Sequence, residues 1–431
     1  MVQGATERGT GCHGTWYSRA TGFVPGFFVI QNDVTAEYRM ALADRWLLPD
    51  GIMELLPPQA RQVELMRRRV LDLYDSWGYD LVMPPIAEHL ESLLTGVGHD
   101  LELNTFKVTD RISGHTLGVR ADMTPQVARI DAHRLRTAGP SRLCYCGSVL
   151  HTHPANMLAS RNPLQLGAEL YGHAGPDSDV EVIALMLATL SEVGVVEPIT
   201  LDLGHVAVFS RLMQLCRLDP QQQTDYQDLL QRKALPEIER FVAGLELDQR
   251  ARRWLQTLPR LNGSVEVLAR ARELFAADAD LVRTIDELET LAQRVVQRCG
   301  EVATYFDLGE LRGYHYHTGV VFAAYTPSHG QALAKGGRYD EIGRDFGRAR
   351  PATGFSADLR TLIDLSTSRP ATDDRAVLAP AGEDRALLRA IGALRAAGER
   401  VVQQLEGEVC EPGRSQRRLV QQGGDWVVVD L

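Results

Sequence analysis

Residues 312–322 constrain the fold of this chain most, because they combine a strand pattern with groups that bind ligands. Aromatic and β-branched residues alternate through this stretch, and Gly313 stands at one end, which predicts a strand over residues 313–322. Arg312 would then enter the pocket that this strand lines. Residues 335–340 and 118–125 share the same mixture of glycine with charged side chains, and they are further candidate binding segments.

Composition places the chain among soluble globular proteins of two or three domains. Its 431 residues carry a formal net charge of −10, which argues against a nucleic-acid-binding face. The sequence has no run of eighteen apolar residues, so we expect no membrane span. Six cysteines without a CxxC pair suit a reducing cytoplasm. Arginine carries most of the positive charge, and the three lysines are Lys107, Lys233 and Lys335.

The chain divides into five predicted parts. Residues 1–39 contain no basic segment followed by an apolar core, so we do not expect a signal peptide. Residues 1–45 are predicted to be a disordered extension, and an over-called start within residues 1–39 is the alternative. Residues 46–208 and 301–368 predict two halves of one α/β core. Residues 209–300 have helical periodicity throughout and read as an insertion between the halves. Residues 369–431 predict a small α/β domain of strand, helix and further strands.

A long amphipathic helix is predicted over residues 58–77. Its apolar stripe includes Val63, Met66 and Val70, with Pro58 in the first turn and Gly78 after the last. A strand closed by two prolines follows at residues 79–85.

The next two segments carry the polar candidates. Residues 103–120 predict a hairpin that turns at Ser113 and Gly114, and a helix opens after Pro125. Asp122 and Thr124 fall at the N-terminus of that helix, where plain capping is the alternative to a binding role.

Residues 142–171 predict two antiparallel strands joined by a loop. Gln165 and Glu169 are four residues apart, so on a strand they share a face. A pair of cysteines and a pair of histidines in this region suggest metal ligands: Cys144, Cys146, His151 and His153. Strand parity directs the two pairs to opposite faces, so we expect packing and no metal site.

These segments together resemble the histidyl-tRNA synthetases of class II, and the resemblance extends over about residues 46–365. Helix, strand and proline match motif 1, the two strands with their loop match motif 2, and residues 354–361 match motif 3. The resemblance implies a mixed α+β fold, with an antiparallel sheet flanked by helices, a helical insertion and a shortened anticodon-binding-like domain. It also implies a homodimer formed through motif 1.

The resemblance further implies a pocket for free histidine. The residues assigned to histidine binding are Asp122, Thr124, Gln165, Glu169, Arg312, Tyr316 and Tyr339, with Arg120 and His317 as secondary candidates. Arg312 would meet the carboxylate, and Asp122, which replaces a glutamate of the family, would meet the ammonium with Glu169. Gln165, Tyr316 and Tyr339 would shape the ring end.

The groups with which a synthetase holds ATP are replaced. His151 and His153 stand where motif 2 has its arginine and glutamate, Thr361 stands at the motif 3 arginine, and Asp358 replaces a glycine. Loss of one bidentate arginine–phosphate contact removes about 1.5–3 kcal/mol. Shifting motif 3 by one residue brings Arg360 close but turns its side chain by about 100°.

This combination is similar to the family of regulatory subunits of ATP phosphoribosyltransferase, which are non-catalytic relatives of the synthetase. The resemblance implies a short-form catalytic subunit as partner, L-histidine as feedback inhibitor, no cofactor and no tRNA. It also implies a homodimer within a larger hetero-oligomer, a hetero-octamer. Two alternatives stay open, an active histidyl-tRNA synthetase and a synthetase-like binding protein with another partner.

Overall fold

A computed structural model describes residues 46–95, 99–154, 159–311, 313–314, 316–344, 346–367, 376–408 and 417–430. The chain separates into two compact units, Met1–Asp50 and Gly51–Leu431, and the elements discussed below belong to the second. The predicted extension at residues 1–45 lies outside the described residues. Within the described part, no helix combines the length and the apolar composition that crossing a membrane requires.

A nine-stranded sheet forms the centre of the core, in the order β1-β5-β6-β12-β11-β10-β7-β9-β8. The strands are β1 (Asp80–Leu81), β5 (Ser141–Ser148), β6 (Leu164–Tyr171), β7 (Thr200–His205), β8 (Asn262–Gly263), β9 (Ala303–Asp307), β10 (Val320–Thr326), β11 (His329–Arg338) and β12 (Ala352–Asp358). The six strands from β5 to β7 in this order pair antiparallel, which confirms the predicted antiparallel sheet.

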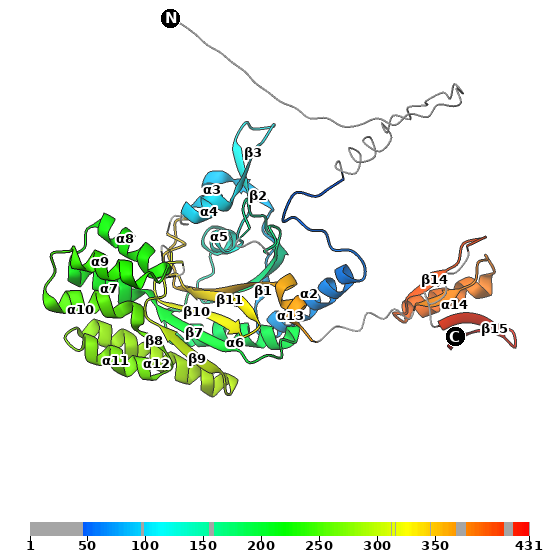
Figure 1. Ribbon diagram of the computed structural model, residues 1–431. Helices are drawn as coiled ribbons and strands as arrows, with labels where there is room; N and C mark the ends of the chain where they lie inside the picture. Colours follow the sequence, from blue (N-terminus) through cyan, green and yellow to red (C-terminus); the bar gives the residue numbers. More distant parts are fainter. Residues whose placement is uncertain are drawn as a thin grey trace, which may run out of the picture. The chain divides into compact units, whose positions relative to one another are not determined.

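Helices α2 (Gln59–Ser76), α6 (Pro176–Val193) and α13 (Leu359–Leu365) pack against one face of this sheet (Figure 1). The stripe predicted on the first helix is buried at Val63, Met66 and Val70, and Gly78 after the helix has a φ of 79°. A left-handed φ costs glycine little, so the helix ends there as predicted.

The opposite face of the sheet is covered by α5 (Thr124–Arg129), which continues into the π-helical turn η1 (Ile130–Leu135) (Figure 1). Met123 and Val127 pack with Tyr145 of β5 and Tyr339 after β11. A three-stranded sheet adjoins α5 and contains β2 (Ala87–His89), β4 (Thr116–Val119) and β3 (Phe106–Thr109). The short helices α3 (Leu90–Leu94) and α4 (His99–Asn104) belong to the same region. The predicted hairpin is therefore β3–β4.

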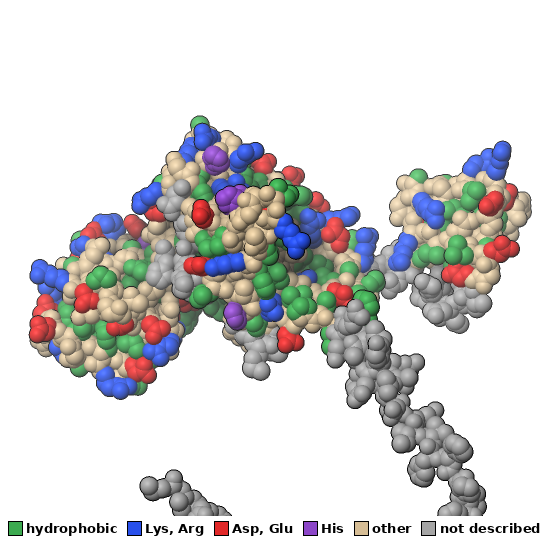
Figure 2. Space-filling view, turned by 90° about the horizontal axis from the view of Figure 1, so that it is seen from above, with side chains coloured by type: hydrophobic (Ala, Val, Ile, Leu, Met, Phe, Trp, Pro, Cys, Tyr) green, Lys and Arg blue, Asp and Glu red, His purple; other side chains and the backbone are tan. Residues whose placement is uncertain are grey.

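The predicted helical insertion is present as a run of helices between β7 and β9. These are α7 (Val206–Cys216), α8 (Pro220–Gln231), α9 (Leu235–Ala243), α10 (Gln249–Thr257), α11 (Glu266–Phe275) and α12 (Ala279–Cys299), with the 3₁₀ turn η2 (Leu258–Arg260). The buried face of α12 packs on α6 and β7, so the insertion shares the main core. Over its surface, basic and acidic side chains are interspersed (Figure 2).

The C-terminal part has a core of its own. Its sheet has the order β14-β13-β15-β16, from β13 (Val377–Ala379), β14 (Val401–Gln403), β15 (Arg417–Gln422) and β16 (Asp425–Asp430). Helix α14 (Arg385–Ala396) starts after Asp384, whose side chain accepts a hydrogen bond from the Leu387 amide. Leu387, Ile391 and Leu419 are buried together.

One local prediction was wrong. The strand predicted over residues 313–322 begins only at Val320, because Gly313 has a φ of 62° and its carbonyl accepts hydrogen bonds from the amides of Tyr316 and His317 in a turn. Helix α6 begins at Pro176. Gly175 is its N-cap and Pro176 occupies the first turn, where a missing amide hydrogen costs nothing.

Candidate functional site

A row of small residues on the face of the sheet that α5 covers creates space for a cavity. Gly337 of β11 pairs with Gly354 of β12, and Gly354 pairs with Glu169 of β6. A Cβ atom at Gly337 would lie 2.7 Å from the His317 ring, and one at Gly354 would overlap the Glu169 carboxylate. Glycine is therefore required where the candidate residues approach the sheet.

The structure brings six of the predicted site residues together around this cavity: Asp122, Thr124, Glu169, Tyr316, His317 and Tyr339. The cavity volume is about 150 Å³. A cavity of that size holds one benzene-sized molecule in other proteins, so it suits an amino acid with a single ring.

Glu169 forms the buried end of the cavity, with 1% of its surface exposed. The Tyr145 hydroxyl donates to its Oε1 at 3.0 Å, and the Tyr339 hydroxyl donates to its Oε2. Burial raises the pKa of Glu169 to about 8, although both hydroxyls act in the opposite direction. A pKa near 8 favours the protonated carboxyl group of Glu169 at neutral pH.

Asp122 is held by Gln165, whose Nε2 donates to Asp122 Oδ1 at 2.9 Å. The Oε1 of Gln165 accepts from the Met123 amide at 2.9 Å, and the Thr124 amide donates to Asp122 Oδ1 at 2.9 Å. Gln165 is not among the described residues that line the cavity. Its place behind Asp122 makes it a positioning residue rather than part of the ring end.

Tyr145 is a site residue that the sequence analysis missed. Its side chain is fully buried, and its hydroxyl lies 3.2 Å from Thr124 Oγ1 as well as within reach of Glu169. It pairs with Gly167 across β5 and β6. Strand parity with Glu169, together with a glycine opposite, is the signal that could have identified it.

Of the two arginine candidates, Arg120 and Arg312, only Arg120 belongs to the described residues. Arg120 is buried and donates to the backbone carbonyls of Ser148 at 2.8 Å and Pro84 at 2.6 Å, away from the cavity lining. It ties neighbouring segments together. Arg312 lies outside the described residues, and only its neighbour Gly313 is seen to line the cavity.

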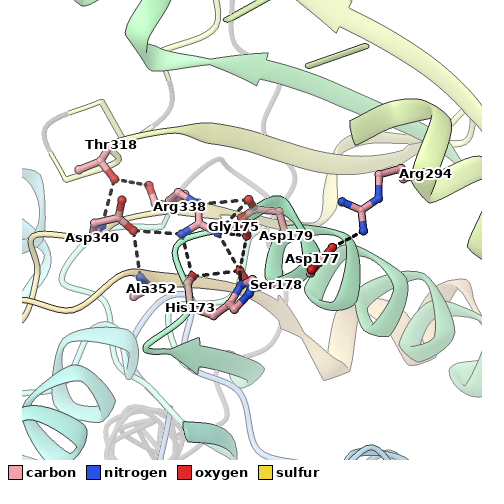
Figure 3. A network of polar contacts seen from close by, with 10 residues as sticks. All are labelled: His173, Gly175, Asp177, Ser178, Asp179, Arg294, Thr318, Arg338, Asp340 and Ala352. Atoms are coloured by element: carbon pink, nitrogen blue, oxygen red, sulfur yellow. Dashed lines mark hydrogen bonds and ion pairs between the residues drawn. The ribbon is translucent and has the colours of Figure 1, made fainter. Parts of the chain in front are cut away.

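Tyr339 is positioned by its two neighbours in the chain, Arg338 and Asp340, whose contacts are drawn in Figure 3. Arg338 is buried and pairs with Asp179 of α6 at 2.9 Å, and its Nη2 donates to Ser178 Oγ at 2.8 Å. Asp340 accepts from the Ala352 amide at 3.0 Å. The segment that carries Tyr339 is thereby fastened to α6 and to the start of β12.

The positions that hold ATP in a synthetase make internal bonds here. The His151 ring lies 2.9 Å from the Ala121 carbonyl. Thr361 donates to Asp358 at 2.9 Å, and Asp358 also accepts from the Arg360 amide as the N-cap of α13. Neither the His151 ring nor the Thr361 hydroxyl can make the charged, bidentate phosphate contact of an arginine guanidinium.

Two arginines beside those positions, Arg161 and Arg360, also bond to the protein itself. Arg161 Nε donates to the His151 carbonyl at 3.0 Å, and its guanidinium lies 5.4 Å from the Phe106 ring centre. Arg360 Nη1 donates to the Met53 carbonyl at 3.3 Å. Among the described residues, no group of three or more metal-binding side chains is gathered.

Comparison with known proteins decides the family. The Histidyl-tRNA synthetase family model matches residues 51–362, and the model of the ATP phosphoribosyltransferase subunit HisZ C-terminal domain matches residues 374–429. An ATP phosphoribosyltransferase regulatory subunit from Thioalkalivibrio sulfidiphilus is 56% identical over 370 residues, which is 86% of this chain and 93% of the relative. The chain belongs to the ATP phosphoribosyltransferase regulatory subunits. The prediction of a regulatory subunit rather than an enzyme is thus confirmed.

Solved structures agree with this family assignment. The ATP phosphoribosyltransferase regulatory subunit/histidyl-tRNA synthetase from Bacillus halodurans C superposes with a TM-score of 0.74 at 28% identity, over 85% of this chain and 94% of that one. A chain of the ATP phosphoribosyltransferase (HisG:HisZ) complex from Thermotoga maritima shares the fold, with a TM-score of 0.53 at 20% identity over 71% and 98%. The predicted class II synthetase fold is confirmed.

Proposed function

We propose that this chain senses free L-histidine and passes that signal to a short-form ATP phosphoribosyltransferase catalytic subunit, with which it assembles. The observation that carries the proposal is the cavity itself, where side chains from three distant segments meet around the buried Glu169, whose pKa is raised by burial. The names of the relatives supply the enzyme, and the Thermotoga maritima complex supplies an example of such an assembly. The reaction would be the first step of histidine biosynthesis.

The proposed pose follows the charges of the cavity. The resemblance assigned Glu169 to the ammonium, but its burial and raised pKa suit an imidazole nitrogen instead, with the Tyr339 hydroxyl beside it. Asp122, held towards the cavity by Gln165, suits the ammonium group. Charge-assisted contacts of about 1.5–3 kcal/mol each, after association costs of several kcal/mol, give roughly micromolar to millimolar affinity. That range matches a metabolite whose concentration is to be sensed.

Histidine binding would bias the assembly between two states and lower the activity of the catalytic subunit. By linkage, the partner must then change the histidine affinity of this chain by the same factor. The cytoplasm is the proposed compartment, since reducing conditions suit the free thiols of Cys144 and Cys146.

The experiment that tests this function is calorimetric titration with L-histidine, followed by reconstitution with a short-form catalytic subunit. Glu169→Ala is expected to abolish measurable binding, whereas Asp225→Asn on the exposed surface of α8 is the matched control. A catalytic subunit that requires this chain and loses activity on adding histidine supports the proposal. Unchanged binding by the Glu169→Ala variant contradicts the site.

We further propose that homodimers form through the motif 1 region, within a hetero-octamer. Strand β1 is the first strand of the nine-stranded sheet, and apolar side chains near it are exposed: Leu81 by 43%, Met83 by 75% and Ile86 by 60%. An exposed apolar edge favours pairing with a second chain. The double variant Met83→Glu with Ile86→Glu should shift sedimentation from dimer to monomer.

A further inference from the structure

Lys335 stands on the cavity face of the central sheet. It lies on β11, two residues before Gly337, and side chains two apart on a strand point to the same face. That face is the cavity face, because a Cβ atom at Gly337 would contact His317. Lys335 accordingly lines the cavity while its side chain stays exposed to solvent.

Strand register shows which end of the cavity Lys335 serves. Gly337 is level with Gly354 and Glu169, at the buried ring end. Lys335 is level with Ser356, which in turn pairs with Gly167. This row is about 7 Å further along the strands, on the side of Gln165, which holds Asp122. Lys335 is therefore beside the end of the cavity assigned to the amino and carboxylate groups.

The lining of the cavity holds more acids than cations. Asp122, Glu169, Asp202 and Glu310 line the cavity, and Lys335 is the sole lysine or arginine among the described lining residues. Among the described residues, no partner forms a hydrogen bond or ion pair with the Lys335 side chain, and Asp202 lies two strands away in the same row. A ligand carboxylate placed among these acids would be repelled unless a cation met it.

We propose that Lys335 binds the α-carboxylate of the ligand, the group that the resemblance assigned to Arg312. It thereby makes the pocket select the amino acid over an analogue that lacks the carboxylate. The proposal rests on the proposed function and assigns a recognition role within the same site. Lys335 is a compact point charge on a flexible stem, so it reaches the carboxylate without a fixed bidentate geometry. Asp122 at the same time matches the ammonium, and together the two residues read a zwitterion.

The test compares two ligands on the full-length chain by calorimetry. L-histidine carries the carboxylate, whereas L-histidinol keeps the ring and the ammonium but ends in a hydroxymethyl group. Lys335→Met keeps the length of the side chain and removes its charge. We expect about a tenfold loss of L-histidine affinity and less than a twofold change for L-histidinol, a tenfold loss being 1.4 kcal/mol. Lys107→Met, which removes a lysine from the exposed pair with Glu102, is the matched control and should bind both ligands as the wild type does.

The outcomes separate this inference from the proposed function. Failure of the wild-type chain to bind L-histidine would overturn the proposed function. Wild-type binding with no loss in the Lys335→Met variant overturns the role of Lys335 and leaves the histidine site standing. An equal loss for both ligands also overturns it, because Lys335 would then shape the pocket rather than bind the carboxylate.

Discussion

The Gln165 carboxamide bridges two neighbours in the chain, donating to Asp122 Oδ1 and accepting from the Met123 amide, each at 2.9 Å. It therefore fixes the carboxylate that we assign to the ligand ammonium without lining the cavity itself.

Replacing Gln165 with Ala should weaken histidine binding by about three- to tenfold, since the Asp122 carboxylate loses one of its two hydrogen bonds. The free energy of unfolding should fall by only about 1 kcal/mol. Titration calorimetry measures the first and urea unfolding the second. Gln221→Ala on exposed helix α8 is the control, and equal affinity in the two variants would show that Gln165 does not position Asp122.

Glu169→Gln should remove a pH dependence of folding. The pKa of Glu169 is raised to about 8 in the folded chain, against about 4.3 for an exposed glutamate. Unfolding therefore releases a proton between these values, and the folding stability of the wild type declines as pH rises from about 5 to 8. In urea unfolding, the free energy of unfolding of Glu169→Gln should rise relative to that of the wild type between pH 5 and pH 8, by on the order of 1–4 kcal/mol. Parallel curves for the two proteins would mean that Glu169 is ionised throughout.

Histidine affinity should follow the same proton. The ring nitrogen and Glu169 share one proton in the proposed pose. Binding should therefore weaken above about pH 8, where the Glu169 carboxyl group of the unliganded chain loses its proton. Calorimetry between pH 7 and 9 measures this fall, with L-histidinol as the second ligand to separate it from changes at the carboxylate end. A Glu169→Gln variant whose residual binding weakens just as steeply would assign the effect to another group.

Tyr145→Phe should lower histidine affinity by a few fold. The change removes one hydroxyl that donates to Glu169 and leaves the ring packing of Tyr145 in place. With one donor fewer, the pKa of Glu169 should rise further. The pH profile of unfolding is the readout that a purely structural role would not move. Tyr305→Phe, which removes a hydroxyl bonded to Asn262 in the insertion, is the control.

Arg338→Met should destabilise the fold by about 3–5 kcal/mol, because Asp179 would be left as a buried, unpaired charge. Adding Asp179→Asn should recover part of that loss, and urea unfolding of the single and double variants measures it. Arg294→Gln, which breaks only the exposed pair with Asp177, should change stability by less than about 0.5 kcal/mol. A mild effect of Arg338→Met would show that Tyr339 is positioned by other contacts.

Much of the fold was predictable because its signals are local. Apolar periodicity, proline and glycine predict the first long helix and the insertion helices. They also predict strand β6, which carries both Gln165 and Glu169. The turn at Gly313 was missed because alternating aromatic residues are typical of a strand. In the folded chain, hydrogen bonds to the Gly313 carbonyl stabilise a turn instead.

The sequence by itself determined which chemical groups are present, namely acids, tyrosines and a lysine near glycines, with histidine and threonine at the nucleotide positions. Only the tertiary structure decided their neighbours. Strand pairing sets Gly354 beside Glu169, and side-chain packing puts Gln165 behind Asp122 and Tyr145 beneath Glu169. Burial then raises the pKa of Glu169, and this depends on desolvation by segments far apart in the chain, which no local pattern encodes.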